Sequence, residues 1–253
     1  MAVIWKNRYA SLSEPAPLFT VLIAAAGGGS RLGGVYKPLL PLCGKPALAY
    51  SFEAFEGSGF VKRLVVSAPK ERHDEILRVA SACGCTKLAL VTEGGETRTA
   101  SVTKAFTAAF ASGEDVTPFV AVHDAARPLI TVENLNDVFF ACVRYGAAAA
   151  ATKVRDALKH TGRDQLIDAD IDREGVWQIQ TPQAFDTDIF HTALALAAKN
   201  GVETAVDDAA LVTRAGFRVM CVETGQANFK ITYPDDIKMA EAILASRTER
   251  RNP

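Results

Sequence analysis

The sequence has no long hydrophobic run and almost no net charge, and each absence excludes a class of protein. No apolar stretch approaches the roughly 20 residues that a membrane-spanning helix needs. The formal net charge is −1, so no overall positive field draws the chain to nucleic acid or to a membrane surface. Any polyanion that the protein binds must therefore be met by local clusters of lysine and arginine.

Paired cysteines and a targeting segment are also absent. The five cysteines form no CxxC pair and mostly lie in apolar stretches, which indicates reduced thiols in a cytoplasmic protein. The N-terminus has no apolar signal core and is interpreted as an irregular leader. We expect this leader over 1–18, a single domain over 19–247 with an arm at about 155–180, and a short tail over 248–253.

What the sequence does contain is an alternation of short apolar runs and helix-like segments. The apolar runs, typical of buried strands, are 19–26, 64–68, 88–92, 119–123 and 147–154, and the helix-like segments between them are 46–56, 71–82, 98–111 and 131–145. This order predicts an α/β fold with a doubly wound, mainly parallel, Rossmann-like sheet. The functional site of such a fold lies at the carboxyl ends of its strands.

The alternation stops after residue 154. Residues 155–180 are polar, contain turn signals at Thr161-Gly162 and Glu174-Gly175, and predict a β-hairpin arm that projects from the sheet. The remaining chain predicts helices near 186–199 and 207–215, a strand at 217–222, and a closing helix after Pro234. Thr232 and Asp235 fit a capping box at the start of this helix.

A glycine-rich loop with the sequence AAAGGGSRLGG follows the first apolar run directly, at residues 24–34. It is not a dinucleotide fingerprint, because the sixth position counted from Gly27 is Leu32, and it lacks the Gly-Lys-Ser/Thr end of a Walker loop. The free backbone N–H groups of such a loop can cradle phosphates between two cations, Arg31 and Lys37. Taken alone, the loop fits equally well a tight turn with two solvated charges.

Six motifs follow one another along the chain. They are this loop with KPLLPLCGKP at 37–46, GGETRTASV at 94–102, HDAARP at 123–128, the stretch from Asp172-Arg173 to QTPQ at 180–183, DDA at 207–209, and NFKIT at 228–232 with Pro234 and Asp236. In this order they resemble the cytidylyltransferases that act on 2-C-methyl-D-erythritol 4-phosphate, within the wider superfamily of nucleotide-sugar pyrophosphorylases. The resemblance covers roughly residues 19–245.

This resemblance implies an enzyme of isoprenoid precursor biosynthesis. It implies that CTP and the polyol phosphate are the substrates, that pyrophosphate is released, that Mg²⁺ is the cofactor, and that the arm joins two subunits into a homodimer with composite sites. Trp177 and Val176 are candidates for the apolar contact between subunits. The chain departs from the family pattern at Pro38, where Gln is usual, and at Ala157, where the arm usually has Thr.

Joining two phosphate groups requires cations more than a base. The second pKa of a phosphate monoester is about 6, so the nucleophile is largely dianionic at neutral pH. Catalysis then consists of positioning and charge neutralisation. We assign Arg31 and Lys37 to the triphosphate. The resemblance implies that Lys230 reaches the reacting phosphate and that Arg127 and Arg173 bind the polyol phosphate; the alternative for each is an exposed cation in a salt bridge.

Asp124 is the candidate ligand for Mg²⁺ and also a candidate nucleotide-binding residue, because it ends a strand that would face the site. Mg²⁺ prefers one or two carboxylates completed by phosphates and waters. The alternative, an aspartate that caps the next turn and pairs with Arg127, is compatible with this role. His123 is interpreted as structural, since the nucleophile needs no base. By resemblance, the remaining nucleotide-binding candidates are Ala25, Ala26, Gly27, Gly95, Glu96 and Ser101.

Three other functions compete with this one. A relative that uses ribitol 5-phosphate would carry Ser-Val in place of Ala125-Ala126. A non-catalytic nucleotide-binding homologue is disfavoured by the retained Arg31, Lys37 and Asp124. An NAD-dependent reductase is disfavoured by the glycine spacing.

Overall fold

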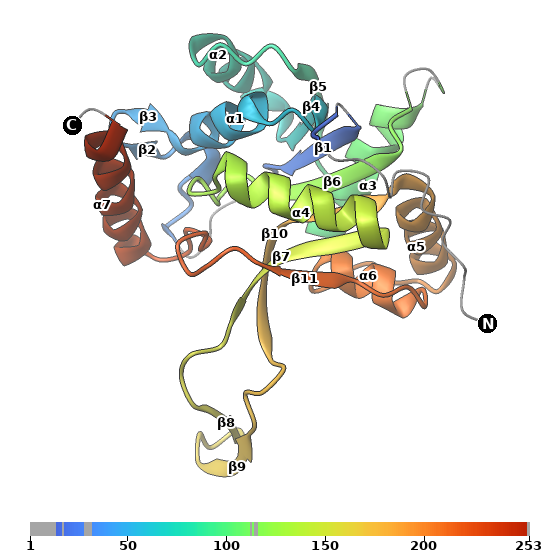
Figure 1. The fold of residues 1–253 in the computed structure, drawn as a ribbon, viewed down its shortest axis with the longest axis vertical. Helices are drawn as coiled ribbons and strands as arrows, with labels where there is room; N and C mark the ends of the chain where they lie inside the picture. Colours follow the sequence, from blue (N-terminus) through green and yellow to red (C-terminus); the bar gives the residue numbers. More distant parts are fainter. Residues whose placement is uncertain (1–13, 17, 28–31, 112, 114–115, 252–253) are drawn as a thin grey trace.

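The computed structural model describes residues 14–16, 18–27, 32–111, 113 and 116–251 and is built around one sheet of seven strands (Figure 1). The strand order is β11-β7-β10-β6-β1-β4-β5. The strands are β1 (Phe19–Ala24), β4 (Val61–Ala68), β5 (Leu88–Glu93), β6 (Phe119–Asp124), β7 (Ala147–Lys153), β10 (Trp177–Asp186) and β11 (Met220–Glu223). All pairings are parallel except those of β10 with its two neighbours.

Helices cover both faces of this sheet. One face carries α1 (Ala47–Gly57), α2 (His73–Ala82) and α4 (Val132–Tyr145), and the other carries α3 (Arg98–Phe110), α5 (Thr187–Lys199) and α6 (Asp208–Arg214). The alternation of β1 explains the two cores: Val21 and Ile23 pack under the first group, and Leu22 packs under the second. The predicted α/β doubly wound fold is therefore confirmed, with its strands and helices close to the predicted positions.

A smaller third core lies beside the sheet. The final helix α7 (Pro234–Arg251) packs there near a short hairpin formed by β2 (Pro41–Leu42) and β3 (Lys45–Pro46). Helix α7 runs past the expected domain end at residue 247. Its start is held by Asp236, whose Oδ2 accepts hydrogen bonds from the backbone N–H groups of Thr232 (2.6 Å) and Tyr233 (2.8 Å). The capping acid is thus Asp236 and not the predicted Asp235, because Pro234 takes the first helical position.

Strand β10 is the element that the sequence did not predict over its full length. It inserts between β6 and β7 and runs antiparallel to both. Pro182 lies within it, and a proline argues against a central strand because it cannot donate to the ladder. The pairing of β10 with β7 tolerates this proline because the register shifts between Ile179 and Gln183.

The predicted arm is present as a separate hairpin of β8 (Leu158–Thr161) and β9 (Ile167–Ile171) that extends away from the sheet (Figure 1). Its strands are almost wholly exposed. Among the helices of the described residues, none has both the length and the hydropathy needed to cross a membrane.

Candidate active site

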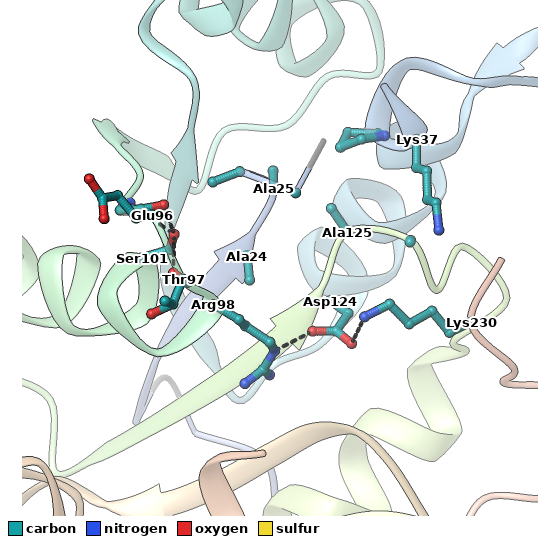
Figure 2. A pocket seen from close by; sticks show the side chains of 15 residues that line it. Ala24, Ala25, Lys37, Glu96, Thr97, Arg98, Ser101, Asp124, Ala125 and Lys230 are labelled. Atoms are coloured by element: carbon teal, nitrogen blue, oxygen red, sulfur yellow. Dashed lines mark hydrogen bonds and ion pairs between the residues drawn. The ribbon is translucent and has the colours of Figure 1, made fainter. Parts of the chain in front are cut away.

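A pocket of about 330 Å³ opens at the carboxyl ends of β1 and β6, the edge that the fold class predicts (Figure 2). The two strands are paired so that their last residues, Ala24 and Asp124, stand opposite each other. The pocket is lined by Ala24, Ala25, Ala26, Gly27, Lys37, Pro38, Gly95, Glu96, Thr97, Arg98, Ser101, Asp124, Ala125, Ala126 and Lys230. Segments from five places in the sequence therefore meet around one cavity.

The carboxylate of Asp124 lies between two cations in this pocket. Its Oδ1 accepts a hydrogen bond from Arg98 Nε at 2.9 Å, and its Oδ2 accepts one from Lys230 Nζ at 2.9 Å (Figure 2). Arg127 Nε is more distant, at 3.9 Å from Oδ2. Burial by itself would raise the pKa of Asp124, but the surrounding cations outweigh burial and hold the pKa well below its usual range. The carboxylate is therefore ionised at neutral pH.

The backbone of Asp124 is fixed by the irregular part of β10. Thr181 lies where the register of β10 shifts, and its Oγ1 accepts a hydrogen bond from the Asp124 backbone N–H at 3.0 Å. The same hydroxyl lies 3.1 Å from His123 Nδ1. Burial lowers the pKa of His123 to about 3, so the ring is neutral and packs edge-on against Phe55. This environment agrees with the structural role expected for His123.

Arg98 is a residue of the described pocket lining that the sequence did not predict. Its Nη1 lies 2.7 Å from Oδ2 of Asp208, a carboxylate that is 1% exposed. Burial lowers the pKa of Arg98, but Asp208 and Asp124 together raise it well above its usual value. The pKa of Asp208 is raised because burial outweighs the attraction of Arg98. Both residues lie in motifs that carry the family resemblance, Arg98 in the second motif and Asp208 in the fifth. An arginine and an aspartate with no assigned role in two such motifs are the signal from which their ion pair could have been predicted.

Glycine and serine shape the wall opposite Asp124. A Cβ on Gly94 would lie 2.3 Å from the Cβ of Ala26, so only glycine allows the loop before α3 to approach the end of β1 this closely. Ser101 Oγ accepts a hydrogen bond from the Gly95 backbone N–H at 2.9 Å and donates to the Thr97 carbonyl at 2.9 Å. Ser101 therefore holds the loop that presents Gly95 to the pocket.

Lys37 enters the pocket from the short 3-10 helix η2 (Lys37–Leu39), and its Nζ donates to the Ile231 carbonyl at 3.0 Å. This bond ties the loop after β1 to the segment that carries Lys230. Pro38, the departure from the family pattern, lies in the first turn of η2. A proline fits there because its fixed φ suits the first turn and its missing N–H is not needed.

The arginines assigned from the sequence are not brought to the pocket in this single chain. Among the described lining residues neither Arg127 nor Arg173 appears. Arg127 Nη1 donates to the Asn228 carbonyl at 2.8 Å, and Arg173 lies on the exposed arm, where it bonds the carbonyl of Arg155. Arg31 falls within 28–31 and lies outside the described residues.

Comparison with known proteins identifies relatives over nearly the whole chain. The family model described as IspD: 2-C-methyl-D-erythritol 4-phosphate cytidylyltransferase matches residues 19–246. The chain belongs to this family. A cytidylyltransferase of this name from Pelotomaculum thermopropionicum is 40% identical, covering 90% of this chain and 95% of the relative. One from Chlorobium phaeovibrioides is 37% identical, covering 92% and 99%.

Solved structures of the IspD family agree. The crystal structure of 2-C-methyl-D-erythritol 4-phosphate cytidylyltransferase from Thermus thermophilus is 32% identical, has a TM-score of 0.72, and covers 91% of this chain and 98% of its own. The 4-diphosphocytidyl-2C-methyl-D-erythritol synthase from Anaerococcus prevotii has a TM-score of 0.76 at 24% identity, covers 90% and 96% of the two chains, and supports the fold alone.

Proposed function

We propose that this protein is a cytoplasmic enzyme that transfers the cytidylyl group of CTP to 2-C-methyl-D-erythritol 4-phosphate. The products are 4-diphosphocytidyl-2-C-methyl-D-erythritol, an isoprenoid precursor, and pyrophosphate. One observation carries the proposal: in a chain of the IspD family, Lys37, Lys230 and Asp124 line one pocket beside small residues that leave room for a nucleotide.

The reaction requires positioned charge rather than a base. A phosphate oxygen of the polyol phosphate forms a bond to the α-phosphorus of CTP, and the bond from that phosphorus to the pyrophosphate oxygen breaks. Lys37, Lys230 and, in the segment outside the described residues, Arg31 would offset the charge of the two polyanions. The backbone near Gly95 and Glu96 would read the cytosine edge, and Ser101 would act by holding that backbone.

Asp124 is the residue that would hold Mg²⁺. The described residues contain no group of three or more acidic, histidine or cysteine side chains that could together hold a metal ion, and Mg²⁺ bound to a triphosphate does not need one. Asp124 offers an ionised carboxylate at the pocket wall, a hard oxygen donor of the kind that Mg²⁺ selects. When bound, the cation would neutralise charge on the phosphates. Lys230, which contacts Oδ2 of Asp124, would then turn toward the reacting phosphate.

The position of Arg173 supports a site completed by a second subunit. The arm that carries Arg173 extends away from its own sheet (Figure 1), and an isolated hairpin is not stable in water without further packing. Val176 and Trp177 are half-buried, whereas Leu166 and Ile167 are 69% and 66% exposed on the arm. Leu166 and Ile167 therefore offer a partner larger exposed fractions of their side chains than Val176 and Trp177 do. We propose a homodimer in which the arm brings Arg173 to the partner's polyol phosphate.

A substrate matrix tests the proposed activity. Pyrophosphate release is measured with each of the four NTPs against 2-C-methyl-D-erythritol 4-phosphate and ribitol 5-phosphate, with and without Mg²⁺. We expect turnover with CTP, the methylerythritol phosphate and Mg²⁺ together. Faster turnover of ribitol 5-phosphate would overturn the choice of acceptor, and equal turnover of another NTP would overturn the choice of nucleotide.

A further inference from the structure

Arg98 bridges two carboxylates of which only one lines the pocket. Its Nε bonds Oδ1 of Asp124, and its Nη1 lies 2.7 Å from Oδ2 of Asp208. Figure 2 shows Arg98 reaching Asp124 from the start of α3, while Lys230 approaches the same carboxylate from the other side. Asp208 is 1% exposed and does not belong to the described residues that line the pocket. Any effect of Asp208 on the reaction must therefore pass through a neighbour.

The contacts of Arg98 indicate that it acts on Asp124 rather than on substrate. Its Nε and Nη1 already contact the carboxylates of Asp124 and Asp208, so neither atom is left to bond a phosphate. Burying a carboxylate costs several kcal/mol unless a cation pairs with it closely, which explains why Asp208 keeps the guanidinium in place. Lysine could not replace Arg98, because a single ammonium lacks the planar fork that reaches two acceptors in fixed directions.

Hydrogen bonds join the elements that carry Arg98 and Asp208 to their neighbours. Asp208 is the first residue of α6, and the next residue, Ala209, donates its N–H to Gln183 Oε1 at 2.8 Å. The start of α3 and the segment before α6 are joined by Thr97 Oγ1, which donates to the Glu203 carbonyl at 3.2 Å. Arg98 is thus held at both ends by elements that are packed on the sheet.

We propose that Arg98 and Asp208 are positioning residues for Asp124. Asp208 holds the guanidinium, the guanidinium holds Oδ1 of Asp124, and Oδ2 is left facing Lys230 and the pocket. The inference rests on the proposed function, because it assigns the purpose of this geometry to the carboxylate used in nucleotidyl transfer. Partners that orient a ligating carboxylate typically affect metal affinity or activity by 10- to 100-fold.

The test centres on Asp208→Asn, which removes a charge without changing the pocket wall. We expect kcat to fall about 10-fold while KM for CTP changes less than about threefold. The affinity of the enzyme–CTP complex for Mn²⁺, measured by electron paramagnetic resonance, should also fall about 10-fold. A folded variant with unchanged kcat and Mn²⁺ affinity would overturn the proposal. A lowered KM for CTP would also overturn it, because it would show that the freed Arg98 binds phosphate.

A double-mutant cycle separates action through Arg98 from an independent effect. If Asp208 acts through Arg98, then Arg98→Lys combined with Asp208→Asn should be about as slow as Arg98→Lys alone. Multiplication of the two single effects would contradict this coupling. If Asp208→Asn does not fold, Arg98→Lys and Asp208→Glu, which keep every charge, are compared instead: both should lower kcat at unchanged KM for CTP, and normal kcat in both overturns the proposal.

Two matched variants serve as controls. Asp186→Asn changes another aspartate at the start of a helix, at the opposite end of the sheet. Arg63→Lys replaces another arginine that makes two hydrogen bonds, to Thr20 and to the Ala109 carbonyl. Both should keep wild-type kcat and Mn²⁺ affinity. If the wild-type protein shows no turnover with CTP and methylerythritol phosphate, the proposed function fails. The effect of Asp208→Asn on Mn²⁺ binding to the CTP complex still decides the positioning role in that case.

Discussion

The charged side chains of this pocket already have partners in the structure without substrate. Asp124 forms ion pairs with Arg98 and Lys230, and the Lys37 ammonium donates a hydrogen bond to a backbone carbonyl. Because these groups are held by the fold, little reorganisation is needed when phosphates replace the existing contacts. Preorganised charge of this kind is usually the largest single contribution to catalysis.

Removal of either lysine should slow the reaction far more than it weakens the fold. For Lys37→Ala and Lys230→Ala we expect kcat to fall about 10²-fold, the typical cost of losing one preorganised donor. Pyrophosphate release at saturating CTP measures this effect. Lys238→Ala, at an exposed position of α7 beside Asp235, is the control and should be unchanged. Undiminished pyrophosphate release by Lys37→Ala would refute the charge-neutralisation mechanism.

Gly94, which lies against the end of β1 beside the pocket, should be hard to replace. Gly94→Ala places a methyl group 2.3 Å from the Cβ of Ala26, and such overpacking typically costs about 1–3 kcal/mol. The melting temperature should fall and KM for CTP should rise, because the nucleotide wall is displaced. Gly27→Ala, whose added Cβ meets nothing within 4 Å, should keep the wild-type melting temperature. Equal melting temperatures for the two variants would contradict this close approach.

At the scale of helices and strands, hydrogen bonds at the ends of elements connect the helices to the sheet. The end of α1 is tied to the start of β5 by Glu56, whose carboxylate accepts hydrogen bonds from the backbone N–H groups of Thr86 (3.0 Å) and Lys87 (3.1 Å). Lys87 Nζ in turn donates to the carbonyls of Glu56 (2.7 Å) and Ser58 (2.8 Å). These bonds satisfy carbonyls that the end of a helix would otherwise leave unpaired.

This junction should make stability depend on pH through Glu56. Burial alone would raise the pKa of Glu56, but the hydrogen bonds from Thr86 and Lys87 lower it below its usual value. A lowered folded-state pKa contributes stability above the unfolded pKa of about 4.3, and this stability is lost as the pH falls through the folded-state pKa. Glu56→Gln should therefore be about 1 kcal/mol less stable than wild type at pH 7, with a smaller gap at pH 3.

Urea unfolding of the wild type and of Glu56→Gln at pH 7 and pH 3 measures the difference in their free energies of unfolding. Glu53→Gln is the matched control, because Glu53 pairs with Lys45 on the surface with side chains that are 38% and 51% exposed. Such a pair should contribute less than about 1 kcal/mol at either pH. A Glu56→Gln gap that is the same at both pH values would show that the carboxylate charge does not matter.

In the molecule as a whole, the arm stands out because its apolar side chains Leu166 and Ile167 are largely exposed. Ile167→Asp on the exposed arm should weaken the proposed dimer about 10-fold or more, since an isoleucine buried at an interface contributes about 1.5–3 kcal/mol. Light scattering over a concentration series measures the dissociation. Met239→Asp, at an exposed position of α7, is the control and should leave the oligomeric state unchanged. Unchanged assembly of Ile167→Asp would argue against an interface at this part of the arm.

Patterns along the chain were enough to predict the fold class, the arm and the family. Period and length place β1, β6 and the helices between them because these signals are local. The motifs around Gly94 and Asp124 follow strands whose ends must share one edge of a parallel sheet, so their meeting could be predicted. Within the described residues, Lys37, Lys230 and Asp124 do line one pocket.

The full extent of β10 and the partners of Asp124 depend instead on contacts made in three dimensions. Pro182 argues against a central strand in any local pattern. A strand can nevertheless contain it because the register of β10 shifts beside β7. Arg98, Asp124 and Asp208 are far apart in the sequence, and the bridge between them depends on how α3, β6 and α6 pack. Contacts between side chains that are far apart in the sequence depend on tertiary packing, whereas hydrophobic periodicity reflects only interactions between residues that are near one another along the chain.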